Sequence, residues 1–501
     1  MRVLIRADAS PTIGSGHIAR CLTLARVLRA QGAHVAFACR LLIGHRLHAL
    51  EADGFETFSL PDFYPGEEPQ QAIESLLPWQ ADIDALEQVL ADRPGFDWII
   101  VDHYGLDHHW QTAARRLAPR IMAVDDLATR TYNVDLLLNQ NLSGTQAAYE
   151  GLLPEHCRTL LGPRYALLRD EFRCGAIEIK PKVKRVLVNF GGFDAAMQTH
   201  HAMLALADYP ELEVDFVAGA DNPAWARMQS MSASRPHWRL HSFVSHFHKL
   251  MLEADLFIGA GGGTSWERAA MGLPTICIAV SNNQQANSDV MATFGAHVYL
   301  GRREDVTVEQ LGQAIGFVVD NQRLRQSLAE HSRRLVDGLG VSRVAVALAG
   351  ALLRVRPATL ADARLLFEGR NAEAVRRVSM DHSPVGWDGH CQWLRASLVN
   401  PQRLLLVGEA SDGPVGVLRY DLQGSDALVS IYLFENRLGV GWGRALLAHG
   451  ETFVTAHWSQ LSSFTAQVLP GNQASLDLFR QAGFSQDPCV FTRVLKDQLH
   501  E

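Results

Sequence analysis

Short apolar runs alternate with amphipathic segments through roughly the first 350 residues of the chain. Residues 3–8 and 34–39 are apolar runs of strand length, and residues 16–31 between them repeat apolar side chains at helical spacing. Further strand-length runs follow at 98–101 and 121–124. Because strands that alternate with helices join into parallel sheets covered on both faces, this pattern predicts an α/β domain.

The same pattern starts again at residues 185–190. It continues through three more strand-length runs and a closing helix, at 214–220, 255–261, 274–280 and 342–353. We therefore expect two Rossmann-like domains, over residues 1–165 and 166–350, facing each other. In open sheets of this kind a ligand binds at the carboxyl ends of the strands, and here also in a cleft between the domains.

Residues 353–501 follow a different order. A strand opens the segment, helices come next, and three further strands lead to a glycine-rich turn and a helix. The strand runs are LRVRPAT, RLLLVGEA, GPVGVLRYDL and ALVSIYLF. No low-complexity linker precedes this segment, and we place the junction near residue 352. The order predicts a third domain, of α/β type.

Composition narrows the range of partners. The 501 residues carry a net charge of −8, with 47% hydrophobic and 20% charged residues. A negative chain lacks the basic surface typical of nucleic-acid-binding proteins. No apolar run reaches the roughly 18 residues of a membrane helix. We expect neither a nucleic-acid nor a membrane partner.

The cysteines point to a reducing compartment. There are seven of them, an odd number, and none forms a C-x-x-C pair. The chain also begins directly on a strand-like run, without the pattern of a signal peptide. We expect reduced thiols in a cytoplasmic protein, and no metal site.

The segment after the first strand carries the first candidate site. Gly14 and Gly16 let the backbone approach a ligand closely, and the unpaired amides of a helix start favour an anion. His17 stands at that helix start, where the positive end of the dipole disfavours imidazolium and keeps the ring a neutral general base. Arg20 falls on the same helix face, three residues further on.

Two other interpretations of this segment stay open. Gly14-x-Gly16-x-x-Ala19 formally fits a dinucleotide-binding fingerprint, but the first glycine comes several residues after the strand. The second strand also ends at Arg40, where an NAD site would carry an acidic residue. The other alternative is a surface histidine at a helix start, without a catalytic role.

The second candidate site lies in the other α/β half. Gly261 and Gly262 follow a strand-length run, and Glu267 falls at the start of the next helix. A glycine loop can cradle a diphosphate, and a carboxylate can accept hydrogen bonds from both ribose hydroxyls. Asn283 and Gln284, after the next strand, can reach sugar or phosphate groups. The alternative is a tight turn that only packs against the sheet.

These elements together resemble the glycosyltransferase-B superfamily, in which a UDP-sugar lies between two α/β domains. Several spaced motifs look more specifically like the UDP-2,4-diacetamido-2,4,6-trideoxy-β-L-altropyranose hydrolases of pseudaminic acid biosynthesis. They are RADASPTIGSGHIARCLTLA at the start, VDHYGLD at 101–107, GPRYALLRDEF at 162–172, NFGGFD at 189–194 and GAGGGTSWE at 259–267. The resemblance covers about residues 1–345.

This resemblance implies hydrolysis of a UDP-sugar without a metal. Water attacks the anomeric carbon, UDP leaves, and the anomeric configuration inverts. The family's catalytic base corresponds to His17, and Tyr104 matches a family tyrosine in the cleft. The substrate contacts expected from the motifs and their surroundings are Asp8, Gly14, Gly16, Arg20, Gly261, Gly262, Glu267, Asn283 and Gln284.

Residues 354–498 resemble the GCN5-related N-acetyltransferases. The residues that carry the likeness are RPAT at 356–359, Arg370-Asn371, His390-x-x-Trp393, LGVGWGRALL at 438–447 and Asn472-x-x-Ser475-x-x-Leu478-Phe479. The glycine-rich stretch corresponds to the loop that grips the pyrophosphate of acetyl-CoA through backbone amides at a helix start. The resemblance implies acetyl-CoA contacts at Leu433, Gly439, Gly441, Gly443, Arg444 and Asn472.

Two positions depart from the acetyltransferase pattern. Leu438 stands where that family prefers Gln or Arg, although Arg437 is adjacent. Phe479 stands where the family often has a tyrosine, whose hydroxyl can reprotonate the CoA thiolate, and a phenyl ring cannot do this. Glu435 is a candidate for deprotonating an acceptor amine.

The two resemblances together predict a bifunctional enzyme. In the family's pathway an N-acetyltransferase acts on the 4-amino group of the UDP-amino sugar immediately before the hydrolase, and a fusion raises the local concentration of the shared intermediate. Two alternatives are a UDP-sugar glycosyltransferase with an appended acetyltransferase and a non-catalytic nucleotide-sugar sensor. The first 60 residues lack the apolar and basic patch that such a glycosyltransferase often shows, and His17 and Tyr104 argue against the sensor.

Overall fold

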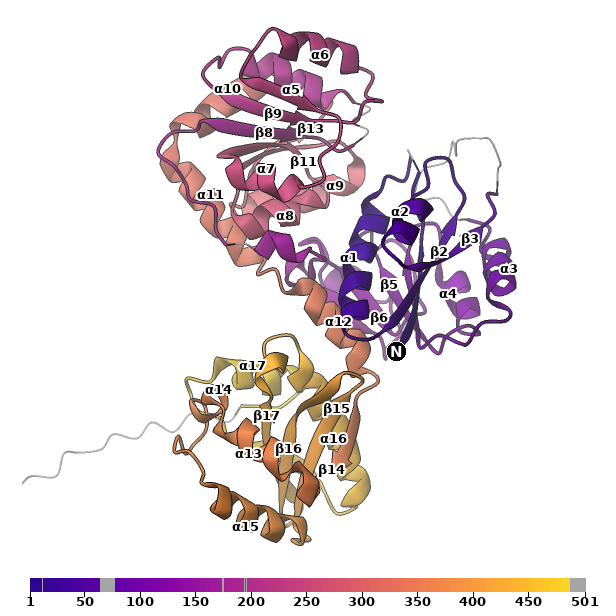
Figure 1. The fold of residues 1–501 in the computed structure, drawn as a ribbon, viewed down its shortest axis with the longest axis vertical. Helices are drawn as coiled ribbons and strands as arrows, with labels where there is room; N and C mark the ends of the chain where they lie inside the picture. The colour runs from indigo at the N-terminus through magenta and orange to yellow at the C-terminus, as the bar shows by residue number, and fades with distance from the viewer. Residues whose placement is uncertain (11, 64–76, 174, 193, 195, 487–501) are drawn as a thin grey trace, which may run out of the picture. The chain divides into compact units, whose positions relative to one another are not determined.

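The computed structural model describes residues 1–10, 12–63, 77–173, 175–192, 194 and 196–486. The chain divides into two compact units, residues 1–345 and 346–501 (Figure 1). Parts of the sequence discussed above lie outside the described residues, namely Pro11, Cys174, Phe193, Cys489 and the end of the predicted third domain, 487–501. The five cysteines in the described part are free.

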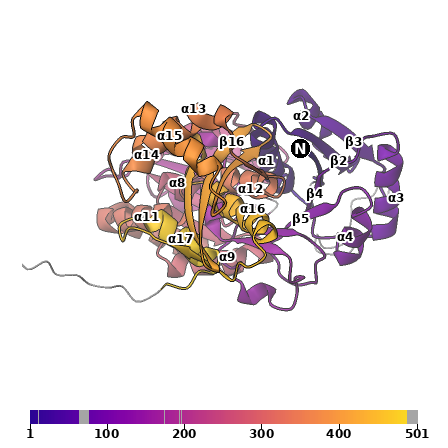
Figure 2. The same cartoon turned by 90° about the horizontal axis from the view of Figure 1, so that it is seen from below.

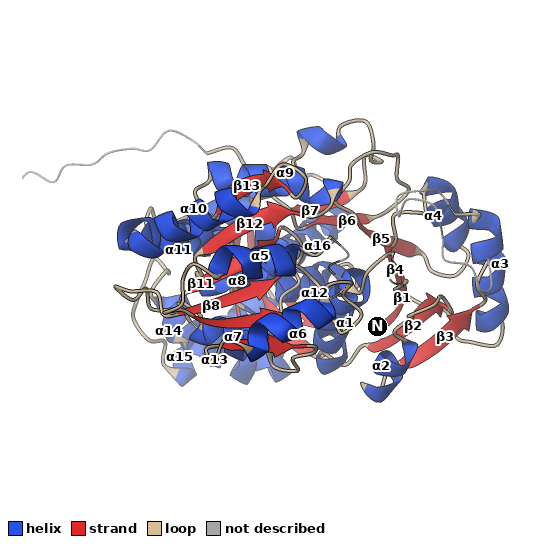
Figure 3. Cartoon of the chain, turned by 90° about the horizontal axis from the view of Figure 1, so that it is seen from above, coloured by secondary structure: helices blue, strands red, loops and turns tan. Residues whose placement is uncertain are grey.

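The first sheet has seven parallel strands in the order β3-β2-β1-β4-β5-β6-β7. Because side chains alternate along a strand, Leu4 packs with Leu86 and Trp110 beneath α3 and α4, whereas Ile5 points to the face that α1 covers (Figure 3). The elements are β1 (Arg2–Ala7), α1 (Gly16–Ala30), β2 (His34–Arg40), α2 (Leu47–Ala52), β3 (Glu56–Leu60), α3 (Trp79–Leu90), β4 (Trp98–Asp102), α4 (His108–Ala114), β5 (Arg120–Val124), β6 (Leu136–Asn139) and β7 (Arg158–Leu161).

The second sheet belongs to the same compact unit and has six parallel strands in the order β10-β9-β8-β11-β12-β13. Its strands are β8 (Arg185–Asn189), β9 (Glu213–Val217), β10 (Trp238–His241), β11 (Leu256–Ala260), β12 (Thr275–Ala279) and β13 (Val298–Arg302). Its helices are α5 (Gln198–Leu206), α6 (Trp225–Ala233), α7 (Phe247–Glu253), α8 (Thr264–Met271), α9 (Asn282–Thr293), α10 (Val308–Asp320), α11 (Gln322–Leu335) and α12 (Gly340–Gly350).

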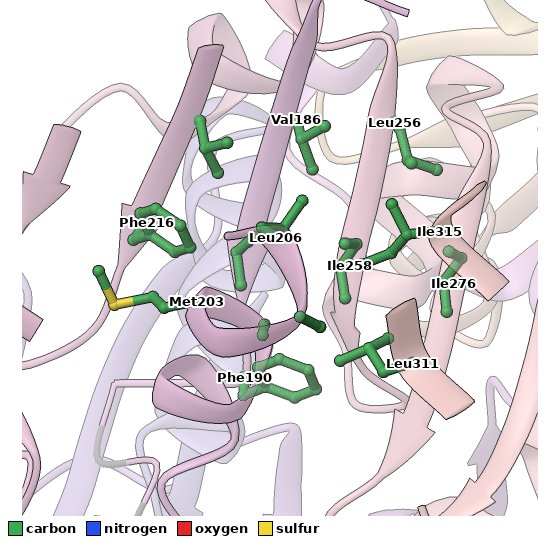
Figure 4. Close-up of a cluster of buried hydrophobic side chains, with 14 of the residues drawn as sticks. Val186, Phe190, Met203, Leu206, Phe216, Leu256, Ile258, Ile276, Leu311 and Ile315 are labelled. Carbon is green, nitrogen blue, oxygen red and sulfur yellow. The ribbon is translucent and has the colours of Figure 1, made fainter. Parts of the chain in front are cut away.

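The core of this sheet lies between its strands and α5, α6 and α10. Figure 4 shows Leu206 of α5 and Ile315 of α10 among strand side chains such as Val186 and Ile258. All four side chains are fully buried, and such burial is the main favourable contribution to folding. A smaller cluster around Phe257, with α7 and the end of α8, covers the other face.

The C-terminal unit is built on a five-stranded sheet of order β14-β15-β16-β17-β18. Its strands pair antiparallel except β17 and β18, which are parallel. Alternate residues of β15 face two cores: Leu406 packs on the side of α16, and Leu405 on the side of α13 and α15. Figure 2 shows this unit with α13, α15 and α16 labelled. The elements are β14 (Arg354–Pro357), α13 (Ala363–Asn371), α14 (Glu373–Arg376), α15 (Trp387–Leu398), β15 (Arg403–Ala410), β16 (Gly413–Gln423), β17 (Asp426–Leu433), α16 (Trp442–His457), β18 (Ser463–Ala466) and α17 (Gln473–Gln481).

The boundary of the C-terminal unit falls inside α12, a few residues before the predicted junction near 352. The reason is packing, because Val346 and Ala349 of α12 belong to the core of the C-terminal sheet. Among the described residues, no helix is long and apolar enough to cross a membrane.

Strand order places two ligand-binding edges in the first unit. In the first sheet β1 lies between β2 and β4, and in the second β8 lies between β9 and β11. The strand order reverses at these positions, so the connections after the central strands leave in opposite directions. In open parallel sheets, ligands commonly bind at the carboxyl ends of the strands at such a point. His17 follows β1, and Gly261 follows β11, so both predicted sites fall at such an edge.

Candidate active site

His17 faces a buried carboxylate at the end of β4. Its Nδ1 lies 2.6 Å from Oδ1 of Asp102, and the two residues meet because β4 pairs directly with β1. An ionised carboxylate only accepts hydrogen bonds, so Nδ1 carries the ring proton and Nε2 keeps its lone pair. Nε2 has no hydrogen-bond partner within the described part of the chain. The ring therefore offers one free basic nitrogen.

Arg20 keeps Asp102 charged. Its Nε and Nη2 donate to the two carboxylate oxygens, each at 2.6 Å, and the thiol of Cys21 donates to Oδ2 at 3.3 Å. Burial opposes ionisation, but the charge of Arg20 and the hydrogen bonds from Arg20 and His17 hold the pKa of Asp102 far below its usual range. Asp102 is thus a fixed negative charge in hydrogen-bond contact with the His17 ring.

The ring of Tyr104 packs against the imidazole of His17. The two rings meet edge to face with centroids 4.8 Å apart. The tyrosine hydroxyl donates to Oδ1 of Asp126 at 2.5 Å, and Arg20 lies 3.6 Å from the other oxygen of that carboxylate. Burial and the charge of Asp126 raise the pKa of Tyr104, so it stays a hydrogen-bond donor. Tyr104, predicted as a catalytic residue, thus lies against the His17 ring with its hydroxyl bonded to Asp126.

The loop between β1 and α1 leaves the helix start open. Gly14 has φ 80°, in the left-handed region that favours glycine, and its amide donates to Ser10 at 2.8 Å. Ser15 precedes the helix without a side-chain cap, so the first amides of α1 have no side-chain acceptor. A Cβ at Gly14 or Gly16 would meet no atom within 4 Å. The open loop suits the close approach of an anionic ligand.

Asp8, expected to touch the substrate, lies behind the site. It is 1% exposed and accepts hydrogen bonds from the guanidinium of Arg6 at 2.6 Å and from the amide of Arg40 at 2.7 Å. His103 reaches it with Nε2 at 3.4 Å, while His103 Nδ1 accepts from the amide of Gly105. The carboxylate is enclosed by these donors. Its position supports a structural role in place of the expected substrate contact.

Side chains of α9 lie beneath the glycine loop of the second sheet and fix its backbone. The amide of Gly261 donates to Oε1 of Gln284 at 3.1 Å, and the amide of Val280 donates to the same oxygen. A Cβ on Gly261 would lie 2.2 Å from the hydroxyl oxygen of Ser288, so a larger residue would push the loop outward. The side-chain carbonyl of Gln284 therefore accepts hydrogen bonds from the loop backbone and holds the loop in place. Asn283 accepts from Ser281 at 2.6 Å.

Glu267 sits in the first turn of α8 with an incomplete set of partners. Its carboxylate lies 3.7 Å from Arg169, which pairs more closely, at 2.7 Å, with Glu171. Burial raises the pKa of Glu267 to about 7, partly opposed by the charge of Arg169. A carboxylate in this state gains from added hydrogen-bond donors. The two hydroxyls of a ribose would supply them.

A chain of hydrogen bonds joins the two loops. The indole Nε1 of Trp266 donates to Oδ1 of Asn141 at 3.2 Å, and Nδ2 of Asn141 donates to Asp126 at 3.3 Å. Asp126 in turn accepts from Tyr104, which touches the ring of His17. Trp266 is 1% exposed. These hydrogen bonds and the ring contact therefore link His17 to the start of α8.

In the C-terminal unit, the sheet opens where α16 begins. β17 pairs with β18 only from Asp426 to Val429, which leaves its second half without that neighbour. Gly439 and Gly441 follow, with φ of 77° and 104°, and α16 starts without a side-chain cap. Free strand edges accept an extended amide chain, and free helix-start amides accept phosphate. The residues present fit a pantetheine diphosphate.

Other residues predicted for this region have local structural partners. Asn472 caps α17, because its Oδ1 accepts from the amide of Ser475 at 3.2 Å. Gly443 packs against Leu478 and near Leu433, and Arg444 is exposed on the first turn of α16. Arg437 pairs with Asp412, and the rings of Phe479 and Phe484 meet edge to face with centroids 5.0 Å apart.

Sequence reasoning missed Asp102, Asp126 and Asn141. Asp102 lies inside the quoted motif at 101–107, and it ends a buried apolar run. A charged residue at the carboxyl end of a buried parallel strand is a signal that points to a site. Asp126 and Asn141 have no such local signal, because only strand order brings them to the same edge.

The comparisons with known proteins agree with this geometry. No protein-family model matches the chain. The UDP-2,4-diacetamido-2,4,6-trideoxy-β-L-altropyranose hydrolase of Campylobacter jejuni is 26% identical over 302 residues, which cover 60% of this chain and 98% of that protein. The spore coat polysaccharide biosynthesis protein SpsG of Bacillus subtilis is 28% identical over 192 residues, 37% of this chain and 57% of SpsG.

A solved structure extends the comparison to the fold. Arabidopsis thaliana UGT89C1 complexed with UDP superposes with a TM-score of 0.51 at 15% identity, over 69% of this chain and 99% of that one. The fold of the two parallel sheets is therefore of the glycosyltransferase-B type, as predicted. The chain is related in sequence to proteins of sugar biosynthesis, one of which is named as a UDP-sugar hydrolase.

Proposed function

We propose that this protein hydrolyses UDP-2,4-diacetamido-2,4,6-trideoxy-β-L-altropyranose to UDP and the free sugar in pseudaminic acid biosynthesis. The observation that carries the proposal is the His17–Asp102 pair, which leaves Nε2 free at the carboxyl edge of β1 and β4. The sequence relationship to a hydrolase of that name supports the choice of substrate.

In this mechanism His17 takes a proton from water as the water attacks the anomeric carbon. Asp102 holds the ring in the tautomer with Nε2 unprotonated and stabilises the cation that forms. The water approaches from the face opposite UDP, so the configuration inverts. The free amides at the start of α8 and in the loop before it stabilise the negative charge that develops on the departing diphosphate. No metal is needed.

A glycosyltransferase and a nucleotide-sugar sensor remain the alternatives. The three functions differ in what is released from the UDP-sugar in water alone. The hydrolase releases UDP and free sugar in equal amounts, a glycosyltransferase releases UDP only when an acceptor takes the sugar, and a sensor releases neither. Product analysis by mass spectrometry without any acceptor separates them, and an absence of UDP release refutes the hydrolase proposal.

Uridine binding should depend on pH through Glu267. Its pKa is raised to about 7, so the carboxylate that would accept from ribose is largely protonated at pH 6 and ionised at pH 8. Binding only to the ionised form tightens the Kd about tenfold over that range. Uridine is the right probe because it has no phosphate that titrates there. Calorimetry should show this slope in the wild type and a weak, flat profile in Glu267→Gln; equal slopes contradict the assignment.

We propose further that residues 354–498 bind acetyl-CoA and acetylate the 4-amino group of the preceding UDP-amino sugar. The early end of the β17–β18 pairing and the left-handed glycines before α16 support this proposal. When bound, the cofactor supplies an activated acetyl group. The chain holds the pantetheine along β17 and the diphosphate at the start of α16. Both activities together are tested by product mass from the 4-amino UDP-sugar and acetyl-CoA.

Gly441→Ala should weaken acetyl-CoA binding about tenfold or more. Its φ of 104° is strained for any L-residue, and a strain of about 1–3 kcal/mol shifts the loop that begins α16. Gly424→Ala is the matched control, since Gly424 also has a positive φ, 67°, but lies in the turn between β16 and β17. Titration with acetyl-CoA should separate the two variants. Equal affinities would remove the cofactor from this loop.

A further inference from the structure

Arg268 is a buried cation beneath the glycine loop of the second sheet. It is 2% exposed, and its guanidinium turns back toward the start of α8. Its Nη1 donates to the hydroxyl of Thr264 at 3.1 Å, and Nη2 donates to the carbonyl of Ala260 at 3.0 Å and the hydroxyl of Ser265 at 2.9 Å. All three acceptors are neutral, and all belong to the loop or the first turn.

No carboxylate within the described residues lies at ion-pair distance from this guanidinium. Other buried arginines are balanced: Arg6 pairs with Asp8 and Arg40 with Asp82. Removing a charge from water without a partner is strongly unfavourable. Burial accordingly lowers the pKa of Arg268 to about 10, partly opposed by the electrostatic effects of Cys277 and Glu267.

The position of the charge in the helix makes the imbalance larger. Arg325 is equally buried without a carboxylate, but it donates to carbonyls at the end of α10, where the helix dipole is negative. Arg268 instead adds its charge to the start of α8, which is the positive end. The fold thus concentrates positive charge at this loop, where the guanidinium lies over the ring of Phe257, 4.5 Å from its centroid, and has no carboxylate among the described residues at ion-pair distance.

The loop above Arg268 presents its amides to the outside. The amides of Gly262, Gly263 and Thr264 donate no hydrogen bond within the described part of the chain. A Cβ on Gly263 would meet no atom within 4 Å, so the outer side of the loop is open. Arg268 fixes the loop from below through Ala260 and Thr264. An anion on the outer side would face both the amides and the cation behind them.

We propose that Arg268 is a positioning residue whose buried charge is matched by the diphosphate of the nucleotide. The inference rests on the proposed function, since it takes the loop at 261–264 as the nucleotide site. The guanidinium does not touch the ligand. It acts through the loop that it holds and through the field that it adds. Bond cleavage places a further negative charge on the leaving diphosphate, so the same field also favours the leaving group.

The test compares uridine, UMP and UDP as calorimetric probes on the full chain. Arg268→Gln keeps hydrogen-bond donors but removes the charge, and we expect it to weaken UDP roughly 10- to 100-fold, as for the loss of one unit charge across a partly desolvated loop. Measured at pH 8 or above, where Glu267 is largely ionised, uridine affinity should stay within about threefold, with UMP between, because the phosphates carry the charge that faces Arg268. The unfolding temperature of the unliganded variant should be equal to or above that of the wild type, because an unpaired buried charge has been removed.

Two further variants complete the design. Arg268→Lys keeps the charge and should preserve the ratio of UDP to uridine affinity, which also tests the idea if Arg268→Gln does not fold. Arg325→Gln is the matched control, a buried arginine distant from the loop in sequence and without a carboxylate, and should leave the ratio unchanged.

The possible outcomes distinguish a failure of this inference from a failure of the proposed function. If the wild type binds UDP and Arg268→Gln loses uridine and UDP equally, Arg268 is only structural and the inference is wrong while the nucleotide site stands. A tenfold loss of the ratio in Arg268→Lys also overturns it, because charge is then not what matters. If the wild type binds neither UDP nor uridine, the proposed function fails, and the inference with it.

Discussion

Replacing His17 by alanine should lower kcat for UDP release by about 10²–10⁴-fold, the usual contribution of a general base. KM and the affinity for UDP should change little, because the ring contacts water and not the nucleotide. The expected loss is large because, among the described residues, no second base lies in hydrogen-bond contact with Nε2 of His17 and could take over its role. Steady-state kinetics with the UDP-sugar, together with UDP titration, measures both quantities.

The control for this variant is His48→Ala. His48 is on the surface, and its side chain is 90% exposed. It should keep wild-type kcat and KM. Full activity in His17→Ala would remove the histidine from the mechanism, whereas a parallel loss of UDP affinity would show that the variant had damaged the binding site instead of the base.

Asp102→Asn should lower kcat by a similar factor, about 10²–10⁴-fold, with UDP affinity retained. Arg20 donates to the remaining oxygen, so the new amide nitrogen faces His17 and donates to Nδ1. The ring proton then moves to Nε2, and the free base disappears. The negative charge that stabilises the imidazolium is lost as well. Rates and UDP affinity should be measured beside the unfolding temperature, so that misfolding is not mistaken for loss of the base.

Asp53→Asn is the matched control. Asp53 also receives both donors of an arginine from α1, Arg26 at 2.7 and 2.9 Å, but this pair lies at the surface. A surface pair contributes little, so the variant should keep both activity and stability. An unchanged kcat in Asp102→Asn would mean that the carboxylate does not control the histidine.

Much of the fold follows from local pattern. The runs at 3–8, 34–39 and 98–101 correspond to β1, β2 and β4, and the helix expected at 16–31 is α1. Buried parallel strands are continuous apolar runs, which is why they are visible in the sequence. The strands β3, β6, β7, β10, β13 and β18 were not predicted, because they are only four or five residues long and most of them include polar residues.

The site was predictable only in part. His17 and Glu267 stand beside glycine loops, and glycine loops after strands are local signals. Asp102, the hydrogen-bond partner of His17, lies 85 positions away in the chain, and the strand order brings the two residues together. Asp8 was predicted as a substrate contact from the motifs and their surroundings, and the structure encloses it between Arg6 and Arg40, contacts that the sequence pattern does not reveal.

Gln284 and Asn472 show why motif positions are not yet roles. Both were assigned to ligands, and in the structure the first holds the amide of Gly261 while the second caps α17. Each can shape a site without touching what binds there. Arg268 is the opposite case, because no motif marked it and only its burial without a carboxylate partner draws attention to it.

The most direct test of the central claim is hydrolysis of UDP-2,4-diacetamido-2,4,6-trideoxy-β-L-altropyranose in water labelled with ¹⁸O, without any acceptor, read by mass spectrometry of both products. Attack of water on the anomeric carbon, with His17 as base, predicts one labelled oxygen in the free sugar and none in UDP. Label in the diphosphate would mean that the phosphorus–oxygen bond breaks, and no release of UDP would mean that the protein is not this hydrolase.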